Sequence, residues 1–244
     1  MATILCYGDS NTFGYIPETG MRYPREIRWP GHLQMLLDTH EEEDQASSAS
    51  ATCPASSDAT VLDKSHSFTV IEEGCNGRTT VTDDPVEGWK NGLDYLKPCL
   101  NSHRPVDMVI LMLGTNDLKE VFHKTAADIA RDVGILVDTI QSFTKEKQGF
   151  VPKIILVSPP HIGKGMTHSV FASAFAPRSI QESVLFAQNY KKTADEKGCI
   201  FFDAAEYVEP SEVDSLHLSA DSHRALAAAL AKVVLRTCGK EMES

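Results

Sequence analysis

Three side chains in two separate segments have the types needed to cleave an acyl bond. Ser10 follows a short apolar run within the sequence Gly-Asp-Ser-Asn, and Asp214 stands three residues before His217. A serine hydroxyl is a weak nucleophile that needs an adjacent base, and a carboxylate orients that base. We therefore expect Ser10 to attack the substrate, His217 to accept the serine proton, and Asp214 to orient His217.

Acyl transfer also needs donors that stabilise an oxyanion, and two glycine-containing segments could supply them. Gly77 lies in Gly-Cys-Asn-Gly-Arg, and Asn116 lies in Gly-Thr-Asn-Asp, each after an apolar run. Loss of one such donor costs roughly 3 to 4 kcal/mol of the barrier. Glycine has no Cβ, so the backbone at Gly77 could approach a substrate closely. We expect Gly77 and Asn116 to form the oxyanion hole.

The side chains around these segments could line the substrate pocket. Candidates for that role are Asn11, Phe13, Tyr15 and Trp89. An aromatic side chain near a strand end is more often part of the core, so both interpretations stay open for the three aromatic residues.

Two charged neighbours of the oxyanion segments are interpreted as structural. Arg78 follows Gly77 and could reach an anionic group, but guanidinium groups more often tie loops together through carboxylates, here Asp83 and Asp84. Asp117 is expected to hold its own loop by accepting backbone N–H groups.

The elements that must position these residues follow from the apolar pattern. Apolar runs without strict alternation predict strands that are covered on both faces, at residues 3–7, 68–71, 108–113, 153–157 and 199–202. Helical spacing predicts helices from Thr125 to Gly149, from Ser179 with Glu182 as a capping box to residue 198, and from Ser219 to residue 239. This alternation predicts an α/β fold with a mostly parallel sheet, which binds ligands at its carboxyl edge.

Composition is consistent with one soluble domain over residues 1–244, with 42% hydrophobic and 23% charged residues. Residues 40–67 break the pattern with an acidic cluster and a Ser- and Ala-rich tract, so we expect an exposed, mobile insertion there. The 23 Lys and Arg against 34 Asp and Glu give a net charge of −11, without a basic run. We therefore expect neither nucleic acid nor anionic membranes as partners.

The cysteines and the first residues indicate the cellular compartment. The six cysteines are dispersed without a Cys-x-x-Cys pair, so we expect reduced thiols and no metal site, with Cys75 acting as a small buried hydrophobe. The first residues lack a signal-peptide pattern, and no apolar run is long enough to cross a bilayer. The expected location is the cytoplasm.

Taken in order, the blocks Gly-Asp-Ser, a central Gly, Gly-x-Asn-Asp and Asp-x-x-His resemble the SGNH, or GDSL-type, hydrolase family over nearly the whole chain. The segments Glu-Glu-Gly-x-x-x-Arg-Thr-Thr and Met-Leu-Gly-Thr-Asn-Asp are most similar to its bacterial arylesterase/acyltransferase branch. The resemblance implies a three-layer α/β/α sandwich with a five-stranded parallel, flavodoxin-like sheet, and neither metal nor organic cofactor. It also implies that the N–H of Ser10 is a third oxyanion donor.

The sequence departs from the family pattern in two places. Asn11 stands where the motif that names the family has leucine, which would alter the pocket floor more than the chemistry. The insertion at residues 40–67 has no counterpart in the branch, so the resemblance leaves open whether the chain forms a homo-oligomer.

The expected function is that of a serine esterase. Ser10 would form an acyl-enzyme from a short-chain aryl or alkyl ester, a small molecule, and pass the acyl group to water or to an alcohol. A carbohydrate O-deacetylase or a thioesterase would use the same four blocks. A non-catalytic binding protein on this fold would normally have lost one member of the set, and all members are present here.

Overall fold

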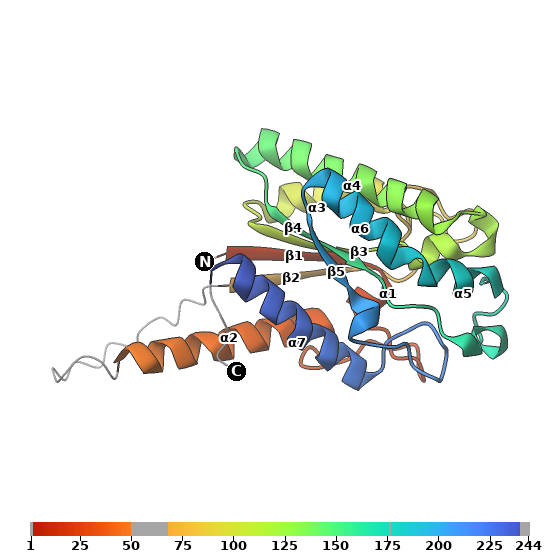
Figure 1. Ribbon diagram of the computed structural model, residues 1–244, viewed down its shortest axis with the longest axis horizontal. Helices are drawn as coiled ribbons and strands as arrows, with labels where there is room; N and C mark the ends of the chain where they lie inside the picture. The colour runs from red at the N-terminus through yellow and green to blue at the C-terminus, as the bar shows by residue number, and fades with distance from the viewer. Residues whose placement is uncertain (1, 50–67, 176, 240–244) are drawn as a thin grey trace.

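The computed structural model describes residues 2–49, 68–175 and 177–239. They form three layers, with one sheet between two layers of helices (Figure 1). The strands are β1 (Ala2–Gly8), β2 (Phe68–Gly74), β3 (Met108–Met112), β4 (Lys153–Ser158) and β5 (Ile200–Asp203). All neighbouring strands pair in parallel in the order β2-β1-β3-β4-β5. The predicted α/β/α sandwich with a five-stranded, flavodoxin-like sheet is confirmed.

Helices cover both faces of the sheet (Figure 1). One face carries α2 (Trp29–Ala49) and α7 (Ala220–Thr237), and the other carries α3 (Gly92–His103), α4 (Ala126–Gln148), α5 (Pro177–Val184) and α6 (Phe186–Lys197). Short 3₁₀ helices are η1 (Thr115–Leu118), η2 (Glu120–Phe122), η3 (Lys164–His168) and η4 (Ala204–Glu206).

The central strand β3 shows why the strands had to be apolar throughout. Successive side chains of a strand point to opposite faces. Val109 and Leu111 join the core beneath α3, α4 and α6, whereas Ile110 and Met112 join the core beneath α2 and α7. Both faces are therefore buried, which is the physical cause of the unbroken apolar run.

Two of the three predicted helix starts are confirmed, and one is wrong. Thr125 caps α4 in a capping box with Asp128, and Ser219 caps α7. The predicted capping box of Ser179 and Glu182 does not form, because α5 begins at Pro177 and a break at residue 185 separates it from α6. Ser179 Oγ instead donates to the Leu118 carbonyl, and the Glu182 carboxylate accepts the N–H of Ala126.

The expected insertion is partly a helix. Residues 40–49 continue α2 to its end at Ala49, so this part of the expected insertion is helical. Residues 50–67 lie outside the described residues, and the expectation of mobility there stays untested. Helix α2 packs beside α7 through Leu33 and Leu37, which are fully buried.

The buried His223 predicts an acid-sensitive fold. Its side chain lies in the first turn of α7, fully buried, with Nδ1 3.3 Å from the backbone N–H nitrogen of Trp29. Burial, with a smaller contribution from the nearby His217 ring, lowers the pKa of His223 to about 3. An unfolded histidine binds a proton near pH ~6.5, so the unfolded state gains protons first and the free energy of unfolding falls as the pH drops from about 6.5 toward 3.

We expect His223→Gln to remove part of this acid sensitivity. The loss in unfolding free energy between pH 7 and pH 4 should shrink by about 2 to 3 kcal/mol relative to the wild type. Chemical denaturation at both pH values measures it, with the exposed His168→Gln as the matched control. An equal pH dependence in the wild type and His223→Gln would contradict the assignment.

Candidate active site

Ser10 lies at the carboxyl edge of the sheet because the chain turns sharply after β1. Gly8 ends that strand, where a Cβ would collide with the Thr12 side chain, and α1 (Ser10–Phe13) begins at once. The Asp9 side chain caps α1 by accepting the N–H of Asn11 at 3.0 Å. Burial raises the pKa of the Asp9 carboxyl to about 6. Strands β1 and β3 flank the point where the strand order reverses, which is where such sheets bind ligands.

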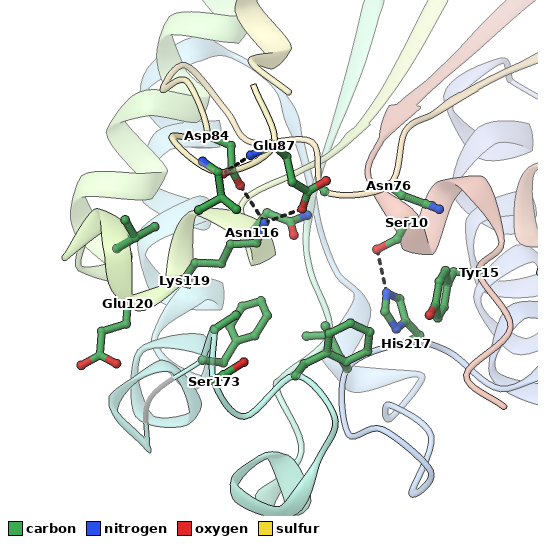
Figure 2. Close-up of a pocket in the computed structure, with 17 residues that line it drawn as sticks. Ser10, Tyr15, Asn76, Asp84, Glu87, Asn116, Lys119, Glu120, Ser173 and His217 are labelled. Atoms are coloured by element: carbon green, nitrogen blue, oxygen red, sulfur yellow. Dashed lines mark hydrogen bonds and ion pairs between the residues drawn. The ribbon is translucent and has the colours of Figure 1, made fainter. Parts of the chain in front are cut away.

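Ser10, His217 and Asp214 form one continuous chain of hydrogen bonds, part of which is drawn in Figure 2. The Nε2 atom of His217 lies 2.9 Å from Ser10 Oγ, and its Nδ1 atom lies 2.7 Å from Asp214 Oδ2. All three side chains are buried. A base placed this way can accept the hydroxyl proton during nucleophilic attack.

Hydrogen bonds from the His217 ring and from two backbone N–H groups hold the Asp214 carboxylate in its charged form. Burial alone would raise the pKa of Asp214, but hydrogen bonds from the His217 ring and from the N–H groups of Leu216 and His217 outweigh it and lower the pKa below its usual value. Ser169 Oγ donates to the Asp214 carbonyl at 2.6 Å and fixes the same loop. An ionised Asp214 keeps the Nδ1 proton of His217 in place, so that Nε2 is free to act as a base.

Gly77 and Asn116 both border the cavity that contains Ser10. Gly77 has a φ of +76°, a backbone conformation that favours glycine, and Asn116 lies in η1 directly after β3. The Nδ2 atom of Asn116 donates to the Arg78 carbonyl at 3.1 Å, which leaves its second N–H for a ligand. The two loops that carry the predicted oxyanion donors are thereby fixed to each other.

The cavity at Ser10 has a volume of about 380 Å³ (Figure 2). Aromatic residues from the segment after η3 form one side of its wall, and charged residues form another. The sequence analysis did not predict most of these residues. The missed lining residues include Asn76, Asp84, Val86, Glu87, Lys119, Glu120, Val121, Phe171, Ser173, Phe175 and Leu216. A cavity of this size accommodates a small substrate.

Only one of the four predicted pocket residues lines the cavity. The Tyr15 ring packs against the His217 ring, with the two centroids 4.1 Å apart. Asn11 instead fixes the histidine loop, because its Oδ1 accepts the N–H of Leu218 at 2.9 Å.

Phe13 and Trp89 also lie away from the cavity wall. Phe13 stacks beneath the Arg22 guanidinium at 4.5 Å from ring centroid to Cζ. Trp89 is 78% exposed, and the Lys90 ammonium lies 4.0 Å from its ring centroid. The interpretation of Asn11, Phe13 and Trp89 as pocket residues therefore finds no support in their positions.

The charged neighbours of the oxyanion loops are structural, although Arg78 acts differently than predicted. Its guanidinium donates to the carbonyls of Gly8 and Glu73 and stacks on the Tyr7 ring at 4.2 Å, so it bridges no carboxylate of the 83–84 pair. The buried Asp117 is structural as expected, but it accepts the N–H of Thr80 at 2.9 Å and so fixes the segment after Gly77 rather than its own loop. Cys75 is a free thiol and half-buried rather than fully buried.

Potential metal ligands gather at one place in the described part of the chain, between the end of β2 and α3. Glu73, Cys99 and His103 offer an oxygen, a sulfur and a nitrogen atom within 4.8 Å of one another. Glu73 Oε1 already pairs with His103 Nε2 at 2.8 Å. Burial, with the nearby charge of Glu73, raises the pKa of the Cys99 thiol to about 12, so a metal would have to displace its proton. We interpret these residues as a cluster that fixes α3 to the end of β2.

A parallel three-layer sandwich with this set of side chains at its switch point is the arrangement of an SGNH-type hydrolase. The chain belongs to the GDSL-like lipase/acylhydrolase family, whose model matches residues 6–225. No curated protein sequence gives a significant match. None of the helices in the described ranges is long and apolar enough to span a bilayer.

Solved structures with the same fold and substantial identity include three esterases. The aryl esterase of M. smegmatis is 34% identical, with a TM-score of 0.80 over 97% of this chain and 99% of that chain. A carbohydrate acetylesterase of Sinorhizobium meliloti is 32% identical, with a TM-score of 0.80 over 97% and 100%. A putative arylesterase of Agrobacterium tumefaciens is 34% identical, with a TM-score of 0.76 over 96% and 98%. With the family match, these neighbours make the chain a carboxylic ester hydrolase.

Proposed function

We propose that the protein hydrolyses short-chain acyl esters through an acyl-enzyme on Ser10. The observation that carries this proposal is the unbroken hydrogen-bond chain from Ser10 Oγ through His217 to Asp214, placed at the wall of the cavity. A serine activated in this way is the nucleophile of acyl transfer.

The proposed reaction has two halves. Ser10 Oγ attacks the ester carbonyl carbon while His217 Nε2 takes its proton, and the oxyanion accepts hydrogen bonds from Asn116 Nδ2 and the N–H groups of Gly77 and Ser10. The C–O bond to the alcohol then breaks, and His217 returns the proton to the leaving alkoxide. Water attacks the acyl-enzyme in the second half, with His217 as the base, and releases the carboxylic acid. An alcohol in place of water would yield a new ester by acyl transfer.

The size of the cavity favours short acyl groups. A volume of about 380 Å³ lies near the lower end for ligand sites, and Phe171 and Phe175 form an apolar wall. A long acyl chain would leave part of its apolar surface in water. We expect kcat/KM for p-nitrophenyl acetate to exceed that for p-nitrophenyl decanoate by about tenfold, measured from p-nitrophenolate release. A preference for decanoate would contradict the short-chain assignment.

A second candidate substrate class is acetylated carbohydrate, which is favoured by the similarity to the carbohydrate acetylesterase of S. meliloti. A thioesterase would use the same side chains. Initial rates on p-nitrophenyl acetate, on a peracetylated sugar and on acetyl-CoA distinguish the arylesterase, carbohydrate acetylesterase and thioesterase activities. Acyl transfer is tested separately by adding methanol and measuring the methyl acetate that forms. Our proposal requires the aryl acetate to be turned over by the Ser10-dependent route.

A further inference from the structure

A carboxylate stands directly against the predicted oxyanion hole. A Cβ placed on Gly77 would lie 3.2 and 3.3 Å from the two carboxylate oxygens of Glu87, and both residues line the cavity. Figure 2 shows the Glu87 side chain pointing from its loop into the cavity. This negative group therefore lies beside one of the proposed oxyanion donors, at the wall of the cavity.

The loop before Glu87 fixes this position. Asp84 Oδ1 accepts the backbone N–H groups of Val86 at 2.8 Å and of Glu87 at 3.0 Å. Asp84 Oδ2 pairs with Lys119 Nζ at 2.8 Å, and the same ammonium lies 3.4 Å from Glu87 Oε1. On the other side, Lys90 Nζ lies 3.2 Å from Glu87 Oε2 and donates to the Asn76 carbonyl. Glu87 is thus held by two ammonium groups rather than swinging freely in solvent.

The charge balance leaves the cavity negative. Its charged lining residues are Asp84, Glu87, Glu120 and Lys119, which sum to a formal −2, and the ammonium of Lys90 beside Glu87 reduces this sum to −1. Lys119 is shared between two carboxylates, and the Glu87 side chain is 46% exposed. The carboxylate of Glu120 points away from Ser10 in Figure 2. Glu87 is therefore the acid placed to act on a charged substrate group near the carbonyl.

We propose that Glu87 sets the charge preference of the cavity, so that the enzyme accepts neutral and cationic esters and discriminates against esters with an anionic group near the carbonyl. This inference rests on the proposed function of Ser10. At a half-exposed site, the repulsion between the Glu87 carboxylate and an anionic substrate group several ångströms away lowers kcat/KM by about tenfold. Salt weakens this repulsion.

Three acetate esters of matched shape test the proposal. They are acetylcholine, which carries a trimethylammonium group, 3,3-dimethylbutyl acetate, which carries a neutral tert-butyl group, and 2-acetoxyethanesulfonate, which carries a sulfonate. All three release acetic acid, and a pH-stat measures the rate. We expect wild-type kcat/KM to be lowest for the sulfonate.

Glu87→Gln should shift the ratio of kcat/KM for acetylcholine to that for the sulfonate about tenfold toward the sulfonate, and 1 M NaCl should shrink this shift. Glu120→Gln removes the same charge from another part of the wall and should shift the ratio by less than about twofold. A ratio unchanged in Glu87→Gln, or shifted equally by Glu120→Gln, would overturn the assignment to Glu87.

These outcomes differ from a failure of the proposed function. If Ser10 is not the nucleophile, Ser10→Ala still hydrolyses the neutral ester. If only the role of Glu87 is wrong, Ser10→Ala is inactive, and the ratio in Glu87→Gln equals that of the wild type.

Discussion

Replacing Ser10 by alanine is expected to lower kcat/KM for p-nitrophenyl acetate by about 10⁴-fold or more, because the acyl-enzyme cannot form without the hydroxyl. The substitution removes one oxygen from a buried site and should leave the fold intact. Stopped assays of purified protein, corrected for spontaneous hydrolysis, measure the effect, and circular dichroism confirms folding.

The matched control is Ser173→Ala, since Ser173 borders the same cavity from an exposed position. Its kcat/KM should stay within about fivefold of the wild type, because a cavity-wall contact contributes far less than the nucleophile. A large loss in Ser173→Ala together with retained activity in Ser10→Ala would place the nucleophile elsewhere in the cavity.

Asp214→Asn is expected to lower kcat by about 10³- to 10⁴-fold. The new amide can keep accepting the N–H groups of Leu216 and His217 through its oxygen, so the loop keeps its anchor. Its NH₂ group would, however, donate to His217 Nδ1, which places the imidazole proton on Nε2 and removes the base that faces Ser10. The KM for p-nitrophenyl acetate should change much less than kcat.

The control for this substitution is Asp221→Asn. Asp221 pairs with Arg224 on the surface of α7, far less buried than Asp214, and should be neutral for kcat. Retention of more than about a tenth of wild-type kcat in Asp214→Asn would mean that the carboxylate does not fix the tautomer of His217.

The sheet could be predicted from sequence because burial on both faces leaves a continuous apolar signal. Residues 108–113 carry that signal because β3 lies in the centre of the sheet, covered on both faces. The break between α5 and α6 could not be predicted, since Ser179 and Glu182 satisfy a local capping pattern but bond to Leu118 and Ala126 instead. Tertiary contacts outweighed the local signal there.

The catalytic residues of the candidate site could likewise be predicted from sequence, whereas the wall of its cavity could not. The chemistry-bearing residues follow strands or precede a capped helix. Their order, their place at the ends of predicted elements and the family resemblance together predicted that Ser10 and His217 would meet. The wall of the cavity had no such signal, because Phe171 and Phe175 lie in an irregular segment without periodicity. The prediction of Trp89 as a pocket residue found no support, because the direction of a side chain in a loop depends on the conformation of that loop. Here the Trp89 side chain faces solvent.

The most direct measurement of the central claim is covalent labelling with a fluorophosphonate, in which Ser10 Oγ would displace fluoride and form an O–P bond. We predict one adduct per chain, located on the peptide that contains Ser10 by mass spectrometry, and a strongly slowed reaction in His217→Gln because the base is removed. An adduct on another residue, or an unlabelled wild type that still hydrolyses p-nitrophenyl acetate, would contradict the account.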